Sequence, residues 1–180
     1  MTGPADVPGS IEVLDGGTLL RFGLADLMRY HGPAFPGGVA HGFVAMRRAW
    51  PLLVPGGVPE RREVRLDTAF PGPGARDAVE LVTRAVTDGR FVVDPALARP
   101  ERGPTLERYV FRFAHRDASV TVQIRDGFVT DEFIALSRRA DRTVAQDDRL
   151  TVLKREMADR LLAVPPDEVY DAVEVHDGST

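Results

Sequence analysis

Two of the four histidines lie close to one segment rich in glycine and proline that runs over Tyr30–Gly38: His31 is within it, and His41 follows it by three positions. Glycine lets the backbone approach a ligand closely, and proline fixes the path of the chain. A helix is predicted to begin near Val39, and the free N–H groups at its start favour anions and developing negative charge. A neutral histidine beside such a start can act as a base or as a hydrogen-bond donor. We therefore predict a ligand site whose floor is this segment and whose proton-transferring group is His31.

His41, in the first turn of that helix, and Asp77, beside a Pro-Gly-Pro-Gly loop, are the candidate catalytic partners of His31. Each has a simpler interpretation. A histidine at a helix start is often only a cap or a surface residue, and a carboxylate near a helix N-terminus is favoured by electrostatics alone. The other two histidines, His115 in a predicted turn and His176 in the tail, are predicted to be solvent-exposed and without a role.

The sequence contains no cysteine, which excludes disulfides, thiolate catalysis, iron–sulfur clusters and cysteine-ligated zinc. His31 and His41 could converge on a metal only through the loop between them. The third ligand would have to be Asp67 or Asp77, so the metal signal is weak. Walker sequences, nucleophile elbows and dinucleotide fingerprints are absent from the sequence. We therefore predict no metal and no other cofactor.

The composition is that of an ordinary globular chain. Its 180 residues fit one domain, and 43% of them are hydrophobic and 28% charged. The net charge is −4 and the basic residues are scattered, so the basic stripe of a nucleic-acid binder is missing. The N-terminus lacks a signal-peptide pattern, and no apolar run approaches the roughly 20 residues of a membrane span. We expect a cytoplasmic protein that binds neither nucleic acid nor a membrane.

The hydrophobic pattern places the candidate residues on helices and strands. We predict a flexible arm over residues 1–18, a single domain over 19–176 and a tail over 177–180. The first half of the domain is predicted to contain helices over Thr18–Tyr30, Val39–Trp50 and Ala75–Val86, and strands over Glu63–Asp67 and Arg90–Val93. Pro51 is predicted to end the second helix, and Pro95–Pro104 to form a polar loop.

The second half has the clearest strand signal. Apolar and polar residues alternate over Tyr109–Phe113 and over Val120–Ile124, which predicts an antiparallel hairpin with one buried face and a turn at His115–Asp117. The remaining predicted elements are a helix capped near Thr130, a helix containing Leu150–Leu161, a turn at Pro165–Glu168 and an edge strand at Val173–Val175. The predicted fold class is α+β: an antiparallel sheet with helices packed on one side and a C-terminal helical hairpin.

Several short motifs follow one another in an order that resembles a known family. The run Asp26–Gly32 followed by Phe35-Pro36-Gly37 is similar to a His-Gly-His-x-Cys-Pro-Gly signature. Later segments are similar to an acidic-Thr turn, an Asp-Ala-x-Gln helix, a Thr-Gly-Cys-Thr motif and a C-terminal ending; they are Leu66–Thr68, Asp77–Glu80, Thr83–Val86 and Leu161–Tyr170. Over Ala25–Val175 the chain thus resembles the FmdE-like family, whose members are similar to one of the components of formylmethanofuran dehydrogenase.

The chain departs from this family at the residues that would hold a metal. The second motif histidine is Pro33 here, the motif cysteine is Phe35, and the Thr-Gly-Cys-Thr motif has also lost its cysteine. The C-terminal zinc appendage of many relatives is missing as well. The resemblance therefore implies a retained pocket and His31, without the thiolates that would bind a metal. A phenylalanine in place of cysteine makes that pocket more apolar, which suits an organic ligand.

Six residues are predicted to bind the substrate in this pocket. Its substrate-binding residues are predicted to be the aromatic Phe35, Phe43 and Phe70, the cation Arg47 for a carboxylate or carbonyl, and Thr68 and Thr83 at family motif positions. Ordinary core packing is the alternative for each aromatic residue. The resemblance also implies a homodimer.

Three hypotheses about function result. The first is a metal-independent enzyme that isomerises, cyclises or eliminates from a small organic substrate, as a lyase or isomerase of a biosynthetic pathway would. In it His31 moves the proton, His41 or Asp77 assists, and the helix start after Gly38 stabilises negative charge. The second is a non-catalytic ligand-binding or accessory protein that kept the pocket. The third retains a metal on His31, His41 and a carboxylate.

Overall fold

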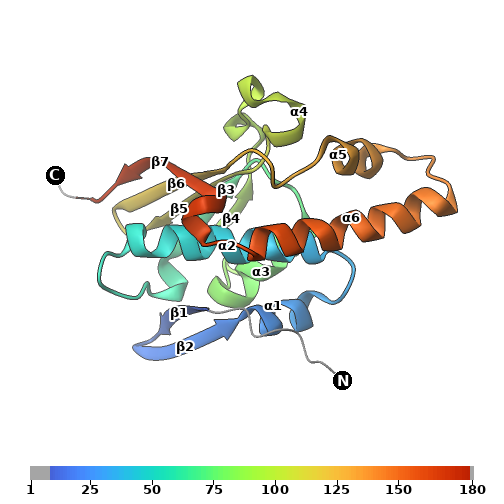
Figure 1. Cartoon of the computed structure of the whole chain (residues 1–180). Helices are drawn as coiled ribbons and strands as arrows, with labels where there is room; N and C mark the ends of the chain where they lie inside the picture. Colours follow the sequence, from blue (N-terminus) through green and yellow to red (C-terminus); the bar gives the residue numbers. More distant parts are fainter. Residues whose placement is uncertain (1–8, 179–180) are drawn as a thin grey trace.

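The structure is a computed structural model that describes residues 9–178, and it has an α+β fold (Figure 1). A separate hairpin is formed by β1 (Ser10–Asp15) and β2 (Thr18–Gly23). A five-stranded sheet has the order β4-β3-β5-β6-β7 and consists of β3 (Val64–Thr68), β4 (Phe91–Val93), β5 (Val110–His115), β6 (Ala118–Ile124) and β7 (Tyr170–His176). Only the β3–β4 pair of this sheet is parallel.

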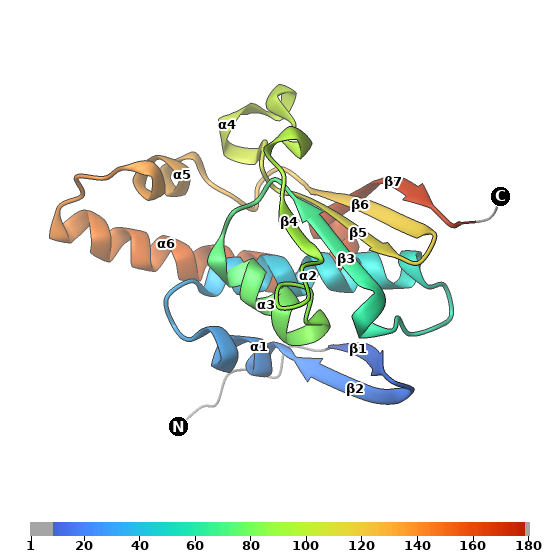
Figure 2. The ribbon, with the colours of Figure 1, turned by 180° about the vertical axis from the view of Figure 1, so that it is seen from behind.

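The α-helices are α1 (Leu24–His31), α2 (Pro36–Leu53), α3 (Pro73–Thr83), α4 (Gly103–Leu106), α5 (Asp131–Arg138), α6 (Val144–Leu162) and α7 (Pro166–Val169). Short 3-10 turns occur at Arg61–Glu63, Pro95–Leu97 and Pro100–Arg102. Figures 1 and 2 show three layers: the five-stranded sheet, a middle layer with α2, α3 and α6, and the β1–β2 hairpin beyond it. The middle layer covers one face of the sheet, as the sequence predicted.

Helix α2 lies at the centre of these layers. Its residues 37–46 are buried without exception, because that stretch contains only apolar residues, glycines and one histidine, His41. It contacts α3 and α6 within its own layer and β5, β6 and β7 of the sheet. A helix that is apolar on all sides has to be covered on all sides, and this requirement fixes the position of its N-terminus inside the molecule.

The β5–β6 hairpin supplies the sheet side of the core. Phe111 pairs with Val122 and Phe113 with Val120, and all four side chains are buried against the helical layer. The opposite face is polar, where Asp67 forms ion pairs with arginines of β3 and β5. The predicted antiparallel hairpin with one buried face is therefore confirmed, as are the helical hairpin α5–α6, the Thr130 cap of α5 and the edge strand β7.

The N-terminal prediction is wrong in part. Residues 10–15 form β1 with Ile11 and Val13 buried, not a flexible arm, while residues 1–8 lie outside the described chain. Gly16 and Gly17 have φ values of 58° and 83°, which is the backbone of a tight hairpin turn. The turn brings residues 18–23 beside β1, where they form β2. The first half of the predicted helix Thr18–Tyr30 is therefore a strand, and the helix begins at Leu24.

Three further details differ from the predictions. Pro51 lies inside α2, which continues to Leu53 because that leucine is buried in the core. His115 is the last residue of β5 rather than part of the turn; it is buried, and its Nε2 accepts a hydrogen bond from the Glu60 N–H at 3.1 Å. The predicted polar loop Pro95–Pro104 contains the two short helical turns and the start of α4.

Candidate functional site

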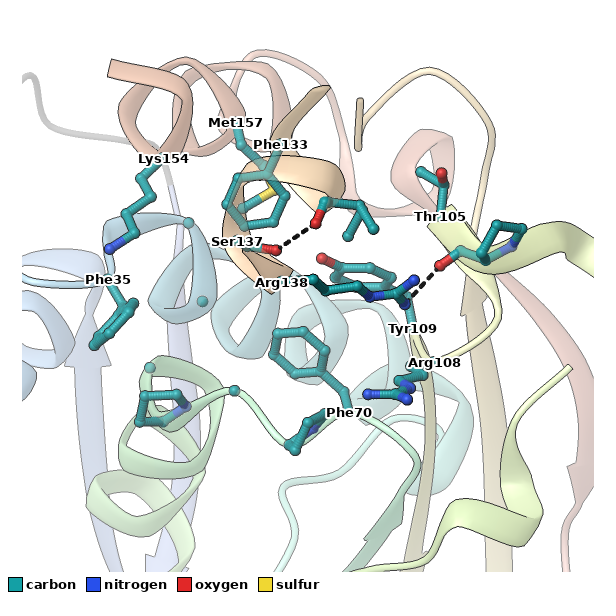
Figure 3. A pocket seen from close by; sticks show the side chains of 18 residues that line it. Phe35, Phe70, Thr105, Arg108, Tyr109, Phe133, Ser137, Arg138, Lys154 and Met157 are labelled. Atoms are coloured by element: carbon teal, nitrogen blue, oxygen red, sulfur yellow. Dashed lines mark hydrogen bonds between the residues drawn. The ribbon is translucent and has the colours of Figure 1, made fainter. Parts of the chain in front are cut away.

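A cavity of about 220 Å³ lies where the N-terminal ends of α2 and α3 meet the helical hairpin α5–α6 (Figure 3). Most of its wall is apolar. The aromatic side chains that line it are Phe35, Phe70, Tyr109 and Phe133, and the charged ones are Arg108, Arg138 and Lys154. The cavity thus combines an apolar interior with a few polar groups, which is typical of sites for small organic molecules.

Two helix starts form one side of the cavity, with Gly37 and Gly38 from α2 and Gly74 from α3. The helices meet this closely because Gly74 has no side chain: a Cβ there would lie 2.7 Å from both the Phe35 carbonyl oxygen and the Val39 nitrogen. In the described chain neither start has a side-chain cap, and neither first turn contains an acidic residue. Since the first N–H groups of a helix carry partial positive charge, this side favours negative charge.

Stacked rings form the inner wall. The Phe70 and Tyr109 ring centroids are 4.8 Å apart, and His41 lies behind them, 4.6 Å from the Tyr109 ring. Tyr109 is only 3% exposed, and its hydroxyl points into the cavity (Figure 3). Burial raises the pKa of Tyr109 well above its ordinary value, so the hydroxyl stays protonated at neutral pH and can donate.

The cations lie at two ends of the cavity. Figure 3 shows Arg108 and Arg138 at one end and Lys154 beside Phe35 at the other. The Lys154 ammonium lies 4.1 Å from the Phe35 ring centroid and donates to a backbone carbonyl, and burial lowers its pKa. Arg138 donates to the Pro104 carbonyl at 2.9 Å. None of the residues that line the cavity in the described chain is an Asp or a Glu.

Helix α5 closes the outer side. Phe133, Ile134 and Ser137 face the cavity, at the spacing of one helical face. None of the side chains of residues 131–138 is fully buried, and the helix is held through its contacts with α6 and its Thr130 cap. This wall is therefore packed much less firmly than the crossing of α2 and α3 opposite.

His41 belongs to the core behind the cavity and not to its lining. Its Nδ1 lies 2.7 Å from the Tyr170 hydroxyl and its Nε2 lies 3.4 Å from the Met157 sulfur. Burial lowers its pKa to about 3, so the ring is neutral at physiological pH. The predicted role of His41 as a proton-transfer partner of His31 is therefore not supported, because both ring nitrogens already have buried partners elsewhere.

His31 is paired with Asp77, the other predicted partner. Its Nδ1 lies 2.8 Å from Asp77 Oδ2 and joins the C-terminal end of α1 to α3. The His31 Nε2 is buried and has no hydrogen-bond partner within residues 9–178. The ring lies 5.8 Å from that of Phe35, which lines the cavity, whereas His31 does not. The geometry is that of an Asp–His dyad placed behind the cavity wall.

The remaining predicted residues divide into two groups. Phe35 and Phe70 line the cavity, so their substrate-binding role stays a prediction. The other four are structural or lie elsewhere: Phe43 is a fully buried core residue, Arg47 stacks on Phe43 and borders a separate polar depression, Thr68 donates to the Val110 carbonyl, and Thr83 donates to the Val79 carbonyl. Hydroxyls that bond to nearby backbone in this way position loops and helix ends rather than ligands.

Sequence reasoning missed the most polar part of the cavity, which comprises Tyr109, Arg108 and Arg138. Tyr109 fits the alternating strand pattern, which accounts for it as a core residue. Arg138 lies at the end of α5, where a basic residue is favoured by the helix dipole alone. The sequence did contain one signal for this part of the cavity, which is α5. Its apolar residues Phe133 and Ile134 lie on the same face of a short helix, and such a face has to cover another part of the molecule.

Within residues 9–178, no three His, Asp or Glu side chains gather as metal ligands would, and no helix is long and apolar enough to cross a membrane. His31, His41 and a carboxylate thus do not converge. Comparison of the sequence with protein-family models and with curated proteins finds no match.

Proposed function

We propose that this protein binds a small organic molecule in the cavity between α2, α3, α5 and α6. The observation that carries the proposal is the cavity itself, with aromatic walls, the Tyr109 hydroxyl pointing into it and a volume of about 220 Å³. Apolar walls supply most of the free energy of binding, and a few polar groups orient the ligand. The second hypothesis from the sequence, ligand binding without catalysis, needs nothing beyond this arrangement.

A cavity-filling variant tests the proposal. Ser137→Trp places an indole in the cavity from the α5 side, whereas Ala140→Trp places one just beyond that helix, where residue 140 is exposed and does not line the cavity. In ligand-observed NMR with a set of small aromatic and aliphatic fragments, we expect binding to wild type and to Ala140→Trp and loss of binding in Ser137→Trp. Absence of binding to wild type, or equal binding to both variants, would contradict the proposal.

A second candidate function is acid–base catalysis on the bound molecule. It is favoured by the His31–Asp77 dyad, because a carboxylate that orients a histidine through one nitrogen leaves the other free to take a proton. His31 is separated from the cavity by Phe35, so catalysis requires that the Phe35 side chain moves aside. The reaction class is an isomerisation, cyclisation or elimination, in which one side chain moves one proton.

The two functions give different results in one pair of variants. If the bound molecule is transformed, His31→Ala and Asp77→Asn should each lower kcat by about 10²-fold or more, since positioned general acids and bases contribute at least that much. His176→Ala, at an exposed histidine of β7, is the control. Unchanged turnover in both dyad variants would exclude this mechanism, and ligand affinity equal to that of wild type would keep the binding proposal.

The FmdE-like resemblance stays a proposal as well. It is supported by the contact between His31 and Asp77, since these residues belong to two different motifs of that resemblance and are 46 positions apart in the chain. A homodimer and a cytoplasmic location are predictions that go with it. Size-exclusion chromatography with light scattering tests the homodimer, and a mass of one chain, 19.7 kDa, would contradict it.

A further inference from the structure

We infer that the ligand of the cavity is an organic anion with an apolar body and one carboxylate, and that the carboxylate binds at the end formed by Tyr109, Arg108 and Arg138. This inference rests on the proposed binding function and specifies its ligand class. It depends on the charges at that end, on the orientation of one buried hydroxyl and on the apolar character of the other walls.

The charged side chains at the Tyr109 end of the cavity sum to one net positive charge. The Glu107 carboxylate lies 3.7 Å from an Arg138 nitrogen and 3.9 Å from an Arg108 nitrogen, so two guanidinium groups share one carboxylate. Glu107 itself does not line the cavity, and no other acidic residue of the described chain does. A single uncompensated positive charge favours a monoanion over a phosphate dianion or a neutral molecule.

Tyr109 provides a donor beside that charge. Its side chain is almost completely buried, yet its hydroxyl points into the cavity. A ligand oxygen that accepts from this hydroxyl gains a hydrogen bond in a mostly apolar surrounding, where such a bond is stronger than in water. The positive charge of Arg138 acts on this hydroxyl, and one N–H of its guanidinium group is already fixed on the Pro104 carbonyl. The remaining guanidinium N–H groups and the hydroxyl form a set of donors for a carboxylate.

The other walls match an apolar body. Away from the arginines the cavity is lined by Phe35, Phe133 and Met157, together with the glycines at the helix starts. The uncapped starts of α2 and α3 add positive potential without adding a charge that would have to be paired. Lys154 at the far end already contacts the Phe35 ring and donates to the Ala34 carbonyl, so it does not require a second carboxylate on the ligand.

Matched ligands test the inference. The probes are benzoate, 1-naphthoate and octanoate, each compared with its primary amide and, for the naphthyl body, with 1-naphthyl phosphate; affinities are measured by isothermal titration at pH 7.5. We expect the carboxylates to bind wild type about tenfold or more tighter than the amides, as one charge-assisted hydrogen bond provides. The phosphate should bind more weakly than the matching carboxylate.

Three variants locate the carboxylate. Arg138→Gln should remove most of the carboxylate preference, and Tyr109→Phe, which keeps the ring, should weaken carboxylate binding about fivefold, the value of one ordinary hydrogen bond. Arg139→Gln is the matched control, because Arg139 is the next residue, is similarly exposed and pairs with Asp141 outside the cavity. Circular dichroism confirms that each variant is folded.

The outcomes separate the two proposals. Amides that bind as tightly as carboxylates, a phosphate that binds more tightly, or equal carboxylate binding by Arg138→Gln, Tyr109→Phe and Arg139→Gln would each overturn the anion inference and leave ligand binding in place. Absence of binding by every probe to wild type would overturn both. Loss of the carboxylate preference in Arg138→Gln and Tyr109→Phe alone would support it.

Discussion

His31 and His41 lie ten positions apart in the chain, but their surroundings are opposite. His41 has both ring nitrogens occupied by buried partners and lies between aromatic rings in the core. His31, whose side chain is 6% exposed, joins the C-terminal end of α1 to α3 through one nitrogen only, and its carboxylate partner is 27% exposed. The residue type and the neighbouring sequence suggested similar roles for both. The packing of α2 at the centre of the molecule separates them, and it makes one a core residue and the other a candidate for chemistry.

The largest expected effect concerns the core histidine. His41→Ala removes a fully buried ring and leaves the Tyr170 hydroxyl without its partner, so we expect a loss of about 3–4 kcal/mol in the free energy of unfolding. Urea denaturation followed by circular dichroism measures it. The exposed His176→Ala should change stability by less than about 0.5 kcal/mol. A loss below about 1 kcal/mol in His41→Ala would show that the ring is not a structural part of the core.

The next effect is the pH dependence of stability. The pKa of His41 falls from 6.5 to about 3 on folding, so below pH 6.5 the unfolded chain takes up a proton that the folded chain does not. Stability is therefore lost as pH falls through this window, by up to about 1.4 kcal/mol per pH unit and about 2 kcal/mol between pH 6.5 and 4.5.

This pH effect is measured as the difference between wild type and His41→Gln in urea denaturation from pH 7.5 to 4.5. The subtraction removes the contribution of the carboxylates, which is common to both proteins. We expect the stability advantage of wild type to shrink as the pH falls. Parallel curves for the two proteins would mean that His41 does not titrate differently in the folded and unfolded states.

The smallest expected effect concerns the dyad. Asp77→Asn weakens one contact at a partly exposed carboxylate, so we expect a loss of about 1 kcal/mol or less in the free energy of unfolding. His31→Ala also removes a ring whose side chain is only 6% exposed, so we expect a loss of about 1–2 kcal/mol. The same urea denaturation measures them. A loss of stability as large as that of His41→Ala would contradict this expectation. It would mean that the dyad stabilises the fold as much as the core histidine does.

Much of the fold follows from local sequence patterns. Alternation over the β5–β6 hairpin and the apolar face of α6 predicted these elements, because each pattern matches the period of one type of structure. The predictions failed where a turn decided the outcome. Gly16 and Gly17 pair the segment that follows them with β1, and this non-local pairing overrides a helical pattern of leucines.

The site was less predictable than the fold. Asp77 was one of two candidate partners of His31, because it lies beside the Pro-Gly-Pro-Gly loop, and the structure brings the two within 2.8 Å. Tyr109 and Arg138 come from distant elements whose own patterns are fully explained by the strand and the helix dipole. Their meeting depends on the path of the chain between β4 and β5 and on the placement of α5. No local pattern encodes either of them.

The weak attachment of α5 has a consequence for the proposed binding of ligands in the cavity. One wall is a crossing of two helices that a single added methyl group would disrupt, and the other is a helix without a fully buried residue. Elements with few buried contacts open at low free-energy cost, so if the cavity binds a ligand as proposed, we expect longer molecules to be accommodated by displacement of α5. Under that proposal, selectivity is expected at the charged end and tolerance at α5, and an occupant that packs against Phe133 and Ile134 should slow hydrogen exchange in this helix first.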